Sequence, residues 1–193
     1  TDSFILGTGA DRAGSLRLAY DNTNAGGATG TTTANLDLSL TNPDFQAFLA
    51  NDLSIGVRQA GNNGGTVNGT LVLGGKSLID LGTATTPANL NIGTNLDDDG
   101  GGGLGEATGL FDATQGTVIT NLDELNVGYS VFGPATGTLR WNSTTPIQAN
   151  TVYIGRGAGA TGILDLTATD SFILGTGADR AGSLRLAYDN TYA

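Results

Sequence analysis

The chain has 193 residues, with 32 glycines, 13% charged side chains and a formal net charge of −10. This acidity argues against a nucleic-acid-binding protein, which needs Lys and Arg side chains to contact phosphates. The absence of Cys and His excludes disulfides, thiolate metal sites and Ser-His or Cys-His nucleophile pairs, and no run of 18 apolar residues is present to span a membrane.

The first segment of the chain returns at its end. Residues 169–191 repeat residues 1–23 letter for letter, as TDSFILGTGADRAGSLRLAYDNT. Asn24 corresponds to Tyr192, and the match resumes at Ala25 and Ala193. Repetition at a fixed period is typical of repeat arrays. We therefore interpret residues 1–168 as one repeat unit and residues 169–193 as the first coil of the next unit, within a longer natural protein.

Shorter strand-like elements recur inside this repeat. The pattern G-x-L-x-L occurs, with variations, at 14–18, 34–38, 69–73, 109–113, 137–141, 162–166 and 182–186. A partner element ending in Gly usually precedes it, at 4–7, 53–56, 90–93, 125–128, 152–155 and 172–175. Two short strands joined by a Gly-rich turn, about every 20 residues, predict a parallel β-solenoid (β-helix). The predicted fold is all-β, with right-handed coils and inserted loops.

Period-two alternation assigns a face to each residue of the G-x-L-x-L elements. The leucines predicted to stack in the core and to form the repeat junction are Leu16, Leu18, Leu164, Leu166, Leu184 and Leu186. The residues between such leucines form a predicted outward charge ladder: Arg17, Asp37, Arg140, Asp165 and Arg185. We expect Asp37 to face Arg17, Asp165 to lie between Arg140 and Arg185, and six to eight coils to span roughly 29–38 Å per unit.

Two segments depart from the strand pattern. Asn42-Pro43 supplies an N-cap and a first-turn Pro, and Phe45, Phe48 and Leu49 share a helical face. We therefore predict a short helix over residues 43–50. The Gly-rich segment 24–33 is predicted to be a loop.

An acidic Gly-rich segment carries the spacing of a calcium loop. Counting Asn95 as the first position, oxygen ligands fall at Asn95, Asp97 and Asp99, with the Gly101 carbonyl at position 7 and Glu106 at position 12. Asn at position 1, Gly102 at position 8 and strands instead of helices on both sides are departures from that motif. The two interpretations are a calcium site and an acidic loop inserted between coils.

Other motifs carry weaker chemistry. The sequences Gly7-Thr8-Gly9 and Gly155-Arg156-Gly157 precede strands, so no helix N-terminus is expected to hold a phosphate, and we predict turns. Paired carboxylates of a polysaccharide lyase or hydrolase could be Asp123 with Glu124, or Asp112 with Asp165. Without a positioned base, solvated or paired acids explain them better, and we predict no enzyme activity.

The alternation of [V/I/L]-x-[I/V/L]-G with G-x-L-x-L resembles the solenoid repeats of large bacterial surface proteins, including autotransporter-type passengers and repeats of exported, sorted proteins. The resemblance implies a secreted adhesin, biofilm-matrix component or fibre at a bacterial cell surface. Because uncapped solenoid ends stack head to tail without closing, we predict a structural unit of an extracellular filament or adhesin stalk, with itself as partner. The alternative is a calcium-dependent module that binds surface glycans.

Overall fold

The computed structural model describes residues 3–22, 30–40, 43–59, 65–96, 105–142, 145–168, 172–175 and 181–188. All regular secondary structure in these ranges is β-strand. They contain no helix long and apolar enough to cross a membrane. The prediction of an all-β fold is confirmed for this part of the chain.

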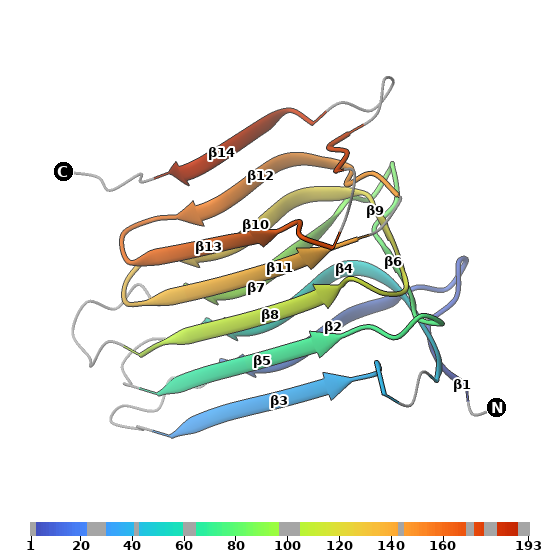
Figure 1. Ribbon diagram of the computed structural model, residues 1–193, viewed down its shortest axis with the longest axis horizontal. Helices are drawn as coiled ribbons and strands as arrows, with labels where there is room; N and C mark the ends of the chain where they lie inside the picture. The colour runs from blue at the N-terminus through green and yellow to red at the C-terminus, as the bar shows by residue number, and fades with distance from the viewer. Residues whose placement is uncertain are drawn as a thin grey trace.

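One sheet consists of the strands that carry the internal G-x-L-x-L elements. Its five strands run parallel in the order β3 (Thr31–Asp37), β5 (Thr66–Val72), β8 (Ala107–Ala113), β11 (Ala135–Trp141) and β13 (Ala160–Asp165). We call it the five-stranded sheet. It faces the viewer in Figure 1.

The second sheet has nine strands and is divided by its longest member, β4 (Asp44–Arg58). The first half of β4 pairs with β1 (Ser3–Leu6) and β6 (Leu78–Leu81), and β6 pairs with β9 (Thr117–Thr120). The second half pairs with β2 (Ala13–Asp21) and β7 (Ala88–Asn95). From β7 the sheet continues through β10 (Leu122–Ser130), β12 (Ala149–Arg156) and β14 (Ser183–Tyr188). All these pairs are parallel.

The chain therefore runs repeatedly through three kinds of strand in a fixed order. The first aligns with the first half of β4, the second aligns with the second half of β4, and the third belongs to the five-stranded sheet. It passes through β1, β2 and β3, then the two halves of β4 and β5, then β6, β7 and β8, then β9, β10 and β11. We call each such pass a layer. A fifth layer holds β12 and β13, and β14 belongs to a sixth. Every strand pairs with strands of adjacent layers, so the layers rise one above another in Figure 1.

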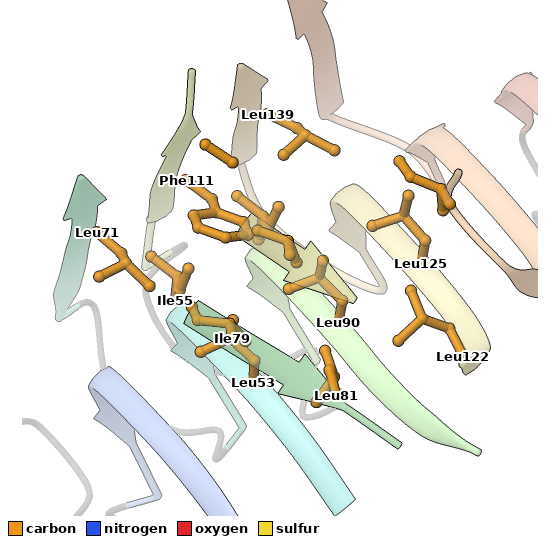
Figure 2. Close-up of a cluster of buried hydrophobic side chains, with 14 of the residues drawn as sticks. Leu53, Ile55, Leu71, Ile79, Leu81, Leu90, Phe111, Leu122, Leu125 and Leu139 are labelled. Carbon is orange, nitrogen blue, oxygen red and sulfur yellow. The ribbon is translucent and has the colours of Figure 1, made fainter. Parts of the chain in front are cut away.

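Apolar side chains in register form columns between the sheets (Figure 2). One column runs through Leu16, Leu53, Leu90, Leu125, Val152 and Leu184. A facing column runs through Leu36, Leu71, Phe111, Leu139 and Leu164. Burying each large apolar side chain contributes roughly 1.5–3 kcal/mol before entropy is counted. The inner members Leu53, Leu90, Leu71 and Phe111 are fully buried.

Glycines occupy the edge where the two sheets approach most closely. Gly56, Gly93, Gly128 and Gly155 share one column, and all have a positive φ. A Cβ added to Gly93 would lie 1.9 Å from the carbonyl oxygen of Thr136. We call this edge the glycine seam. The close approach explains why the G-x-L-x-L element and its partner element both contain Gly. In each element, the backbone at the glycine lies against the backbone of the other sheet, where a Cβ would not fit.

The predicted helix over 43–50 is wrong, because β4 occupies this segment. Phe45, Ala47 and Leu49 alternate inward and are buried, and β1 and β6 pair with the backbone on both sides. Paired neighbours on two edges outweigh the local Asn-Pro signal. The predicted loop over 24–33 is wrong at its end, since β3 begins at Thr31; residues 24–29 lie outside the described ranges.

Candidate assembly surface

The two copies of the repeated segment place the same strand sequence at opposite ends of the layered stack, in β2 and in β14. β2 pairs with β4 on one edge, and β14 pairs with β12 on one edge. Both strands contain the sequence Ser-Leu-Arg-Leu-Ala-Tyr. Within the described part of the chain, β2 therefore shows what this sequence binds on one side, and β14 shows what it binds on the other.

The predicted junction leucines differ in exposure. Leu16, Leu18, Leu164 and Leu166 are partly buried and pack against the core. Leu184 and Leu186 are 52% and 66% exposed. They continue the two columns that are fully buried at Leu90 and Ile92. The last layer thus presents apolar core positions to solvent.

On the β4 side, the repeated strand binds a carboxylate. Asp52 of β4 accepts hydrogen bonds from Ser15 Oγ at 2.6 Å, from Arg17 Nε at 3.2 Å and from Arg17 Nη2 at 3.3 Å. Ser54 Oγ donates to the same carboxylate at 3.0 Å. Partial burial raises the pKa of Asp52, but the bonds from Arg17, Ser15 and Ser54 outweigh it and hold that pKa below its usual value. The hydrogen bonds to Asp52 in turn raise the pKa of Arg17.

On the β12 side, the repeated strand contacts aromatic rings. The Arg185 guanidinium lies 5.4 Å from the Tyr153 ring centroid and 4.7 Å from that of Tyr188. One layer earlier, Arg156 lies 4.2 Å from the Tyr129 ring and 4.3 Å from the Tyr153 ring. Arginines and tyrosines therefore alternate on the outer surface, where each cation–π contact contributes about 0.5–1 kcal/mol.

The predicted charge ladder combines residues from two different sheets. Arg17 and Arg185 lie on the nine-stranded sheet, whereas Asp37 and Asp165 lie on the five-stranded one. The expectation that Arg17 faces Asp37 is wrong: Arg17 contacts Asp52, and Asp37 is in register with Val72. Likewise, Asp165 does not lie next to Arg185, which is in register with Tyr153.

The remaining pair of the predicted ladder lies together. Arg140 Nε is 3.4 Å from Asp165, and Arg140 Nη1 is 3.3 Å from Asp112 of the layer before. Asp37 and Asp165 each bond the Ser or Thr two residues later, and these bonds lower the pKa of both carboxyls. The carboxylates considered for catalysis are similarly engaged: Glu124 contacts Arg156 at 3.2 Å.

Sequence reasoning missed Asp52, Tyr153 and the ion pair between Arg12 and Asp80, whose atoms are 2.9 Å apart. Arg12 lies between β1 and β2, and Asp80 lies in β6, two layers on. Aligning 14–18 with 53–56 would have placed Asp52 beside Ser15 and Arg17. No local signal indicated the Arg12 contact, because it joins residues 68 positions apart.

The calcium loop remains a prediction, because Asp97, Asp99 and Gly101 lie outside the described residues. Asn95 is fully buried, and its side-chain nitrogen donates to the Gly105 carbonyl at 2.7 Å. Glu106 is exposed at the start of the next strand. Across the ranges that the structure describes, no group of three or more His, Cys, Asp or Glu side chains could hold a metal ion.

No family model, curated protein or solved structure matches the chain. The inference of function therefore depends on the layered geometry, on the repeated strand and on the open edge of β14. These three features all concern how one layer covers the next.

Proposed function

We propose that the layers are successive coils of a right-handed parallel β-solenoid, and that the chain is a structural unit of a tandem array. The parallel pairing of every strand with adjacent layers supports this proposal. In Figure 1 the near strands run from left to right and the far strands from right to left as the chain climbs. This is the sense of a right-handed coil, the hand favoured for parallel crossovers.

The repeat length supports one continuous stack. The column from Leu16 to Leu184 crosses five layer steps, from β2 through β4, β7, β10 and β12 to β14. At about 4.8 Å per step, a 168-residue unit rises about 24 Å. This rise is shorter than the 29–38 Å expected from six to eight coils, because the elements at 14–18 and 34–38, counted as separate coils, belong to the same layer.

The proposed role is mechanical: an extracellular filament or adhesin stalk at a bacterial cell surface. Backbone hydrogen bonds between parallel layers run along the stack, and a buried apolar column accompanies them. Such a stack gains length by adding layers, with each layer stabilised by its neighbours. The observation that carries the proposal is the parallel pairing of every described strand with adjacent layers, together with the identical sequence of β2 and β14.

Electron microscopy of chains with one to six copies of residues 1–168, each ending in residues 169–193, tests this function. The account predicts unbranched rods of constant width whose length grows by about 24 Å per copy. Separate globular bodies joined by linkers, or lengths that grow by a variable amount per copy, would rule out the continuous stack.

A further inference from the structure

The open edge of β14 has a defined chemical preference, because β2 has the same sequence. β2 is covered by the second half of β4, in the register Leu16 to Leu53, Arg17 to Ser54 and Leu18 to Ile55. We propose that, in a tandem array, this same β4 segment of the next repeat unit in one covalent chain pairs with the open edge of β14. The proposal rests on the array proposed above and identifies the contact that joins its units.

The occupant brings a carboxylate to a prepared site. Asp52 of the second layer lies against Ser15 and Arg17 of the first, and its side chain is only 17% exposed. Ser183 and Arg185 are the copies of these two residues, on the strand whose apolar positions are uncovered. The next unit's Asp52 therefore meets a hydroxyl and a guanidinium on β14, while the next unit's Leu53 and Ile55 cover Leu184 and Leu186.

The two copies together define the complete surroundings of the junction arginine. Arg17 shows the contact above it, with Asp52 at 3.2 Å. Arg185 shows the contact below it, with the Tyr153 ring centroid at 5.4 Å. In an array, one arginine makes both contacts, so it connects Tyr153 of one unit to Asp52 of the next. Among the described residues, neither end strand makes both contacts.

The same geometry disfavours a different occupant, the first layer of another chain. In the parallel register, β2 placed on β14 would put Arg17 directly against Arg185, with no carboxylate from either strand between them. Like charges directly opposite on adjacent strands are destabilising. The strand that pairs with β14 must therefore be β4 of the second layer and not β2 of the first. This arrangement arises when β14 itself takes the place of β2 in the next unit of one covalent chain.

A double-mutant cycle tests the junction in a two-unit chain, residues 1–168 joined to residues 1–193. The variants are Arg17→Gln and Asp52→Asn in the second copy, alone and together, with urea unfolding as the measurement. We expect each single substitution to lower the unfolding midpoint and the double substitution to lower it scarcely further than the worse single one. Additive midpoint shifts would overturn the proposal.

Two controls separate this proposal from the proposed function. Tyr153→Leu in the first copy should weaken the coupling at the junction, whereas Tyr153→Leu in the second copy should leave it unchanged. X-ray scattering of the same two-unit chain reports whether it is one rod. A single rod with additive shifts of the urea midpoint would contradict only the arginine junction. Two separate bodies would contradict the array itself.

The 193-residue chain itself tests the argument that β2 of another chain does not pair with β14. Sedimentation at increasing concentration should show a monomer at ordinary ionic strength. End-to-end oligomers of the unaltered chain would show that identical layers do dock on each other, and would overturn the argument for a covalent junction.

Discussion

β2 and β14 have the same sequence and different surroundings. In β2, Leu16 and Leu18 are partly buried beneath β4, and Arg17 is bonded to Asp52. In β14, Leu184 and Leu186 are 52% and 66% exposed. Arg185 lies over the Tyr188 ring, as Arg17 lies over the Tyr20 ring, and it also lies near the Tyr153 ring of the layer before. Identical residues are therefore buried to different extents because their neighbours differ: β2 pairs with β4 and faces β3 and β5, whereas β14 pairs, among the described strands, with β12 alone.

The largest expected effect is a difference in the free energy of unfolding between substitutions in the inner layers and in the end layers of the glycine seam. Ala19 and Ala187, with φ of 51° and 48°, occupy in the end layers the column that holds Gly in the inner ones. Gly93→Ala should lower the free energy of unfolding by about 3 kcal/mol or more, because its Cβ meets the Thr136 carbonyl in a left-handed conformation. Ala187→Gly should change it by about 1 kcal/mol or less.

Urea unfolding followed by the fluorescence of Trp141, the chain's one tryptophan and a fully buried one, measures both variants. Similar costs for the two substitutions would show that the seam is no tighter in the middle of the stack than at its end.

The next effect compares two members of one apolar column. Leu90→Ala removes a fully buried side chain and should cost about 2–5 kcal/mol of unfolding free energy. Leu184→Ala should cost about 1 kcal/mol or less in the 193-residue chain, because half of that side chain faces solvent. Thermal or urea unfolding distinguishes them, and a large loss at Leu184 would contradict an open last layer.

The smallest effect is a pH dependence of the contact between β2 and β4, which the described residues do not reproduce at β14. The pKa of Asp52 is lower in the folded chain than its ordinary value. Its contribution to stability is therefore complete above the ordinary Asp pKa and is lost as the pH falls through the lowered one. Urea midpoints between pH 6 and pH 2 should fall less steeply for Asp52→Asn than for the unaltered chain. Parallel curves would show that Asp52 contributes nothing to acid sensitivity.

Alternation and glycine spacing were enough to predict an all-β chain, because each strand buries every second residue, but they left the fully buried Leu49, Leu81 and Leu90 without an assigned strand face. They could not sort the strands, since GSLRL at 14–18 and GTLRW at 137–141 share a local pattern but belong to different sheets. Only register with the neighbouring layer distinguishes them. Phe45, Phe48 and Leu49 fit a helix, whereas Phe45, Ala47 and Leu49 fit a strand; partners far along the chain decide between the two.

The central claim is that, in the array, the next unit covers the open edge of β14. Thiol labelling tests this claim most directly. The chain has no Cys, so Leu186→Cys introduces a single thiol at a side chain that is 66% exposed. The equivalent junction residue in the two-unit chain is the second copy's Leu18, and Cys there should react roughly tenfold or more slowly. Cys at Ile119, an outward side chain of the inner-layer strand β9 that is 40% exposed, should react equally fast in both chains. Equal rates at the junction leucine would contradict the account.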